Sequence, residues 1–239
     1  MRTAFLVMKD HPYGGEMLDR LVAAGCAPEA IIEEDSLLAV RERDKFRVRL
    51  AGQLLPPTPA EVARRGDIPL VRVADHNSPE CLRRVRALAP EVILLGGTRV
   101  LKGPLLEGLV LNVHPGLLPW TRGSSPEAWS VHLDLPVGVT CHRVDAGVDT
   151  GPVLLRRLLE LPPRTSYEAL VRRNVALAAA TMVEAVGLLA AGRCRFRPQE
   201  AGAWETRPAM PPAILEGVAR KLADGRYAPA APPELRGGE

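Results

Sequence analysis

Apolar and polar residues follow one another along the chain in a repeating pattern of short apolar runs and amphipathic stretches. Runs rich in Val, Ile and Leu are typical of strands that are buried on both faces of a parallel sheet. Stretches with apolar residues three and four apart lie between them and predict helices. The expected strands cover residues 4–8, 31–32, 70–73, 92–95 and 109–114. This alternation predicts an α/β fold with a mostly parallel sheet flanked by helices.

Capping residues mark where several of these helices begin. Ser78, which is followed by a proline, is expected to cap a helix over residues 79–89, and Ser125 to cap the next helix. A capping-box pattern at Thr165 predicts the longest helix, which should end near residue 192. We expect one large domain, which would carry the catalytic residues, over residues 1–192 and a partly helical C-terminal extension over residues 193–239.

Two stretches allow more than one interpretation. Residues 9–15 are expected to form a loop in which Gly14 and Gly15 either make a tight turn or bring helix-start amides near an anion. Residues 36–55 are strongly charged and have only a weak helical pattern, and residues 41–45 are expected to form a solvated face. Later in the chain, residues 137–144 have the β-branched content of a strand, and a further strand begins at residue 153.

Composition narrows the class of protein. The 239 residues are 46% hydrophobic and 25% charged, with a net charge of +3, so a nucleic-acid partner is not expected. Aromatic residues are 4% of the chain, too few for a stacking platform. The four cysteines are scattered without a C-x-x-C pair, which favours free thiols in a reducing, cytoplasmic setting. Neither a signal peptide nor a membrane span is expected from the apolar runs.

Three polar residues predict the chemistry of the site. Asn112 and His114 are two apart on an expected strand, so their side chains leave the same face, and Asp149 comes from a later loop. A carboxylate near an imidazole favours the protonated ring, and amide and imidazolium N–H groups can donate to a developing oxyanion. No serine or cysteine stands out as a nucleophile, so the set suits direct acyl transfer between two bound substrates. A metal site built from His114, His142 and Asp149 is conceivable but not expected, because the three residues are not closely spaced along the chain.

Several linked motifs resemble the folate-dependent formyltransferase family, which includes glycinamide-ribonucleotide, methionyl-tRNA and sugar-nucleotide N-formyltransferases. The matching motifs are Asn112-Val113-His114-Pro115, Leu117-Leu118-Pro119, Arg122-Gly123, Gly138-Val139-Thr140 and Asp149-Thr150-Gly151-Pro152. Because they occur in order, they are far more specific than any one alone. The resemblance implies a Rossmann-like sheet in the formyltransferase fold, and 10-formyltetrahydrofolate as the formyl donor.

The resemblance also implies roles for individual residues. Asn112 would hold the formyl oxygen, protonated His114 would stabilise the tetrahedral intermediate, and Asp149 would orient His114 and relay the proton of the amine. The pterin ring would be received by the backbone of one segment and by one loop. These two sets of residues are Arg99, Val100 and Leu101, and Asp145, Ala146, Gly147 and Val148.

The acceptor is expected to be a primary amine of a small molecule, such as an amino-sugar nucleotide or a specialised metabolite. Candidate acceptor contacts are His11, Tyr13, Gly14, Gly15, Trp120 and Arg122. A tRNA acceptor is disfavoured, because residues 193–239 are fewer than the ~70–100 residues expected for a self-supporting barrel with its linker. Hydrolysis of the same folate, a methionyl-tRNA formyltransferase-like activity and a non-catalytic folate-binding module remain alternatives, and the sequence is compatible with a homodimer.

Overall fold

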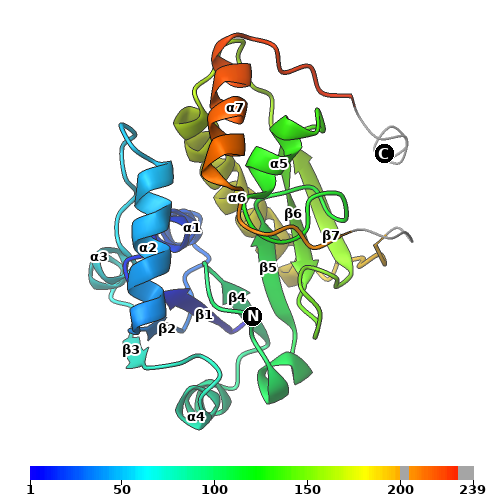
Figure 1. Cartoon of the computed structure of the whole chain (residues 1–239). Helices are drawn as coiled ribbons and strands as arrows, with labels where there is room; N and C mark the ends of the chain where they lie inside the picture. Colours follow the sequence, from blue (N-terminus) through cyan, green and yellow to red (C-terminus); the bar gives the residue numbers. More distant parts are fainter. Residues whose placement is uncertain (200–204, 231–239) are drawn as a thin grey trace.

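A seven-stranded sheet forms the centre of the molecule, which is described by a computed structural model over residues 1–199 and 205–230 (Figure 1). Its strands are β1 (Thr3–Met8), β2 (Ala30–Glu34), β3 (Leu70–Val73), β4 (Val92–Leu95), β5 (Val110–His114), β6 (Gly138–Arg143) and β7 (Val153–Leu158). They lie in the order β3-β2-β1-β4-β5-β6-β7. The first five strands are parallel, and β6 and β7 continue the sheet as antiparallel strands. The mostly parallel α/β sheet predicted from the sequence is confirmed.

Helices cover both faces of the sheet. They are α1 (Pro12–Ala23), α2 (Leu37–Arg49), α3 (Pro59–Arg65), α4 (Pro79–Leu88), the 3-10 helix η1 (Gly103–Glu107), α5 (Pro126–His132), α6 (Tyr167–Ala190) and α7 (Pro212–Ala223). Alternate residues of β1 point to opposite faces, so Phe5 and Val7 enter one hydrophobic core while Ala4 and Leu6 enter the other. The larger core includes residues of α1 and α6, and the smaller one includes residues of α4 (Figure 1).

Two of the three expected helix caps differ from the prediction. Ser78 caps α4 as expected, with its Oγ accepting a hydrogen bond from the Cys81 amide at 3.2 Å. Ser125 stands at the N-cap of α5, but its Oγ accepts from the Met210 amide, and its backbone is left-handed (φ 53°). The cap of α6 is Ser166 rather than Thr165, whose hydroxyl donates to the carbonyl of Pro162.

The predicted loop over residues 9–15 is wrong in its second half, because α1 already begins at Pro12. Gly14 and Gly15 belong to the first turn of this buried helix. A Cβ on Gly14 would collide with the carbonyl oxygen of Gly96, and a Cβ on Gly15 with that of Pro57. The two glycines therefore let α1 approach two neighbouring segments closely, and a tight turn does not form there.

The long helix α6 is a core element. By length and composition alone it could cross a membrane, which the apolar runs did not lead us to expect. Core helices of globular domains pass the same test, and one face of α6 is buried against α1, β5 and β6. This packing explains why its apolar stripe is wide.

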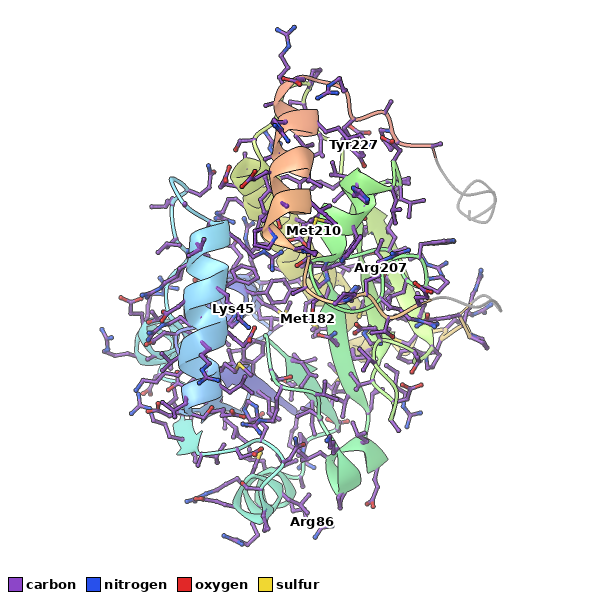
Figure 2. The ribbon with its side chains drawn as sticks, viewed as in Figure 1. Lys45, Arg86, Met182, Arg207, Met210 and Tyr227 are labelled. Carbon is purple, nitrogen blue, oxygen red and sulfur yellow. The ribbon has the colours of Figure 1, made fainter. Side chains whose placement is uncertain are left out.

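The segment after α6 folds back onto the rest of the molecule. Residues 205–210 run beside residues 122–125, where Arg207 and Gly123 form an isolated β-bridge, and α7 then packs on α5. Figure 2 shows Arg207 and Met210 in this segment, next to α5. Residues 200–204 and 231–239 of the expected extension lie outside the described residues.

Candidate active site

A cavity of about 460 Å³ opens where the parallel strands β4 and β5 end. Such strand ends are a common place for ligand sites in α/β folds. The walls come from β4, β5, β6, α1, α2 and three connecting segments, at residues 97–101, 123–126 and 144–149. Asn112, His142 and Asp149 are among the polar side chains that line it.

The carboxylate of Asp149 lies between two histidines. Its Oδ2 is 3.4 Å from Nδ1 of His114, and its Oδ1 is 3.6 Å from Nε2 of His142. The Gly123 amide donates to Oδ2 at 3.1 Å. Asp149 itself has a left-handed backbone (φ 54°), which is uncommon for a residue other than glycine. The predicted proximity of Asp149 to His114 is therefore present.

His114 is buried behind the cavity wall, with 3% of its surface exposed. Its Nε2 faces the carbonyl oxygen of Thr121 at 2.8 Å, while its Nδ1 faces Asp149. Both ring nitrogens therefore face acceptors, and only the imidazolium can donate from both. The arrangement suits a positive charge held directly beneath Asp149.

His142 belongs to the same cluster. Its Nδ1 lies 3.0 Å from the carbonyl of Arg143 and its Nε2 lies 3.2 Å from Nδ2 of Asn112. Burial lowers the pKa of His142, even though the carboxylate of Asp149 opposes this shift. A neutral ring that donates from Nδ1 leaves the Nε2 lone pair to accept from Asn112. His142 thereby fixes one of the two amide N–H groups of Asn112, and the other has no hydrogen-bond partner among the described residues.

The segment over residues 97–101 forms one wall and is fixed by ionic contacts. Nε and Nη2 of Arg99 donate to the two carboxylate oxygens of Glu34 at 2.8 and 2.5 Å, and Nη1 donates to Asp75 at 2.6 Å. The side chain of Arg99 is therefore held by two carboxylates. Asn77 also donates to the carbonyl of Val100. A segment held in this way can present its backbone to a planar ligand.

The loop over residues 145–149 forms the facing part of the cavity lining. Oδ1 of Asp145 accepts from the amide of Gly147 and from the hydroxyl of Thr150, so this carboxylate stabilises the loop. Val148 and Val100 both line the cavity with half-exposed side chains. Ala146 lines an adjoining hollow beside η1 instead.

Helix α2 supplies a wall that the sequence did not predict. Glu42, Lys45, Phe46 and Arg49 all line the cavity, although residues 41–45 were expected to face solvent only. Arg49 forms an ion pair with Glu127, a buried residue of α5. The one signal in the sequence was Phe46, the only aromatic residue in a strongly charged stretch.

His11 and Tyr13 line the cavity as expected. The hydroxyl of Tyr13 donates to the carbonyl of Val113, which ties α1 to β5. The ring of His11 packs against Phe46 with centroids 5.0 Å apart, and its Nδ1 has no hydrogen-bond partner among the described residues. Burial, and then the nearby Arg49, lowers the pKa of His11 to about 4, so its ring is neutral.

The remaining four acceptor candidates lie away from the cavity lining. Gly14 and Gly15 are packed inside α1, as described above. Trp120 is buried, with the guanidinium of Arg156 over its ring at 5.2 Å. Arg122 donates to Gln199 rather than pointing into the cavity. Within residues 1–199 and 205–230, no group of three or more His, Cys, Asp or Glu side chains is placed to hold a metal ion.

The motifs around this cavity match a known family. A family model described as formyl transferase matches residues 1–186. The chain belongs to the formyl transferase family. The family resemblance inferred from the ordered motifs is confirmed, and every residue given for the cavity lining except Ala209 lies within the matched residues.

Relatives of this formyl transferase chain include proteins with different acceptors. It is 32% identical over 194 residues to the methionyl-tRNA formyltransferase of Chloroflexus aggregans, covering 79% of this chain and 60% of that protein. The chain thus spans a little over half the length of such curated relatives. Among solved structures, glycinamide ribonucleotide transformylase 1 of Symbiobacterium toebii has a TM-score of 0.64 at 22% identity, covering 84% of this chain and 95% of that one. The formyltransferase PseJ of Anoxybacillus kamchatkensis, solved with UDP-4,6-dideoxy-4-formamido-L-AltNAc and tetrahydrofolate, has a TM-score of 0.52 at 20% identity, with 95% of both chains covered.

Proposed function

We propose that this chain is an N-formyltransferase that moves a formyl group from 10-formyltetrahydrofolate to a primary amine of a small molecule. The observation that carries the proposal is the convergence of the Asn112 amide and the Asp149 carboxylate, with His114 beneath it, on one cavity. Membership of the formyl transferase family supports the same chemistry.

The three side chains divide the work of the transfer. Asn112 donates its unclaimed N–H to the formyl oxygen as negative charge develops there. The imidazolium of His114 stabilises the same charge through space and orients Asp149. Asp149 accepts the proton that the attacking amine loses. As the new carbon–nitrogen bond forms, the bond from the formyl carbon to N10 of the folate breaks, and N10 takes up a proton.

The folate would occupy the side of the cavity formed by residues 97–101 and 144–149. Val100 and Val148 offer apolar surface that a pterin ring can cover, and the backbone of Arg99 and Leu101 offers polar groups. The pinning of Arg99 to Glu34 and Asp75 supports a preformed wall.

The acceptor amine would enter between α2 and the segment at residues 123–126. Phe46, Arg49 and Ala209 narrow this end, which supports a small acceptor. His11 supports an acceptor contact, because its buried neutral ring carries a nitrogen without a partner among the described residues.

Methionyl-tRNA is a second candidate acceptor. Identity of 32% to a methionyl-tRNA formyltransferase favours it over an unrelated amine. The two candidates separate in a direct assay with 10-formyltetrahydrofolate and three acceptors: UDP-4-amino-4,6-dideoxy-L-AltNAc, glycinamide ribonucleotide and charged methionyl-tRNA. Transfer to the tRNA alone would overturn the small-amine proposal.

Variants test the chemistry independently of the acceptor. We expect Asn112→Ala, His114→Ala and Asp149→Asn each to lower the rate of formyl transfer by about 10²–10⁴-fold, because each removes a donor, a charge or a base. His132→Ala, at an exposed histidine of α5, is the matched control and should keep the full rate. The rates are measured by mass spectrometry of the formylated amine, with circular dichroism as the check of folding.

The remaining alternatives predict other products. Formate release that no added amine changes would indicate hydrolysis of the folate. Tight folate binding without turnover on any acceptor would indicate a binding module. Full transfer activity in Asp149→Asn would defeat the proposed role of the carboxylate.

A further inference from the structure

The segment that follows α6 returns to the loop that carries Asp149. Arg197 pairs with Val153 at the start of β7 through two backbone hydrogen bonds of 2.7 and 2.8 Å. This pairing brings Gln199, two residues further on, beside the turn that precedes β7. Gln199 lies beyond the residues that the family model matches.

The carboxamide of Gln199 makes hydrogen bonds in two directions. Its Nε2 donates to the carbonyl oxygens of Asp149 and Gly151 at 2.8 and 2.9 Å. Its Oε1 accepts from Nε and Nη2 of Arg122 at 3.2 and 2.5 Å. The two contacts with the carbonyls depend on the amide group, because a carboxylate could not donate to them, whereas a carboxylate could still accept from Arg122.

These bonds act on a residue whose backbone conformation is unfavourable. Asp149 has a left-handed backbone, which is a strained conformation for a residue with a side chain. The loop therefore needs contacts from outside to hold the carboxylate in place. Gln199 supplies two of them, at the carbonyls on either side of Thr150.

The segment that follows α6 also supports the side-chain carboxylate of Asp149, through Gly123. Gly123, which follows Arg122, donates its amide to the carboxylate. Arg207 pairs with this stretch, donating its amide to the carbonyl of Arg122 and accepting from the amide of Ser124, each at 3.0 Å. The segment after α6 thus secures Asp149 at its carbonyl directly and at its carboxylate through Gly123.

We propose that Gln199 is a positioning residue that holds the Asp149 loop, and with it the carboxylate, in the geometry needed for formyl transfer. This inference rests on the proposed role of Asp149 as the proton acceptor. Under this inference, the residues that follow the part matched by the family model contribute to the active site through Gln199.

Two substitutions separate positioning from general support. Gln199→Met keeps the length of the side chain but removes all four hydrogen bonds. Gln199→Glu keeps the bonds from Arg122, so the segment stays attached, but it places oxygen against two carbonyl oxygens. Gln53→Glu makes the same change of charge on the connection between α2 and α3, away from the cavity, and is the matched control.

The assay follows formyl transfer from 10-formyltetrahydrofolate to the best acceptor of the panel above, or to water as formate release where none reacts. We expect kcat to fall about tenfold in Gln199→Met and further in Gln199→Glu, with KM for the folate within about threefold of the native value. Gln53→Glu should keep the native kcat. Gln199→Glu tests the proposal even where Gln199→Met does not fold.

A double-mutant comparison shows whether Gln199 acts through Asp149. Once Asp149→Asn has removed the carboxylate, adding Gln199→Glu should slow the reaction by less than about twofold. Effects that multiply in the double variant, or a native kcat in Gln199→Glu, would overturn the inference. Native activity in Asp149→Asn alone would instead contradict the proposed function, so the two failures are distinguishable.

Discussion

At the scale of single residues, the second histidine of the site has a specific task. His142 lies opposite Asn112 in the antiparallel register of β5 and β6, and its neutral Nε2 accepts one amide N–H of Asn112. This contact selects one orientation of the carboxamide, with Nδ2 rather than the oxygen turned toward the ring. In the proposed transfer, this contact preorganises the remaining N–H of Asn112 for the oxyanion.

Replacing His142 should lower kcat and leave the affinity for the folate unchanged. We expect His142→Phe to lower kcat about tenfold, because the amide of Asn112 loses its fixed partner. His142→Gln keeps a neutral acceptor and should lie closer to the native rate. Steady-state kinetics with the folate as varied substrate measure both. A native kcat in His142→Phe would show that Asn112 needs no such partner.

The sequence predicted Asn112, His114 and Asp149 as a set, because strand spacing put Asn112 and His114 on one face and the ordered family motifs added Asp149. It did not predict His142, because the partner of Asn112 depends on whether β6 runs parallel or antiparallel to β5. It also did not predict the ion pairs of Arg99, whose partners Glu34 and Asp75 lie at the end of β2 and just after β3. Contacts between distant segments decided each of these cases.

At the scale of elements, close approach of α1 to the sheet depends on Gly14. Its missing Cβ leaves room for the carbonyl oxygen of Gly96 and a methyl group of Val7. The oxygen belongs to a backbone segment that enters the cavity wall at residue 97, so it cannot move without disturbing the proposed folate side. This explains why a helix can begin so close to the end of β1.

Two Gly→Ala variants should change stability in opposite directions. Gly14→Ala should lower the free energy of unfolding by about 1–3 kcal/mol or more, because the new methyl group overpacks the contact with Gly96. Gly187→Ala, in α6 with open space around the added Cβ, should raise it by about 0.5–1 kcal/mol, because alanine favours helix. Urea denaturation measures both. Equal stability of Gly14→Ala and the native chain would show that the segment yields at little cost.

Predictions at this scale succeeded where the signal was local. Runs of apolar residues identified the strands, and Ser78 identified the start of α4. They failed where a distant segment took over, as when Ser125 accepted from Met210 instead of capping α5. The placement of α2 on the cavity also depended on packing that its charged sequence does not encode.

At the scale of the whole molecule, buried histidines set the response to acid. Burial lowers the pKa of His11, His76 and His142 in the folded chain. Between the unfolded value of 6.5 and the lower folded values, the unfolded chain therefore binds more protons than the folded one. The contribution of these histidines to the free energy of unfolding therefore falls as pH drops through this window. For His11 the window reaches from 6.5 to about 4, which corresponds to about 3 kcal/mol.

One substitution isolates the contribution of His11. His11→Gln should reduce the loss of stability between pH 7 and pH 4.5, since the unfolded chain then has one proton fewer to gain. His132→Gln, at an exposed site, should leave the loss unchanged. Guanidinium chloride denaturation at the two pH values measures the effect. An unchanged acid loss in His11→Gln would mean that His11 does not contribute to it.

The ion pair of Arg49 with the buried carboxylate of Glu127 has a consequence for how specificity can change. It fastens α2 to α5 on the acceptor side, and pulling a buried carboxylate from its guanidinium costs about 3–5 kcal/mol. The distance between α2 and α5 at the proposed acceptor end is therefore fixed, and a bulkier amine could not enter by separating the two helices. If a related enzyme evolved to use a larger acceptor, we expect Arg49 or Glu127 to change before any residue that contacts the transferred carbon.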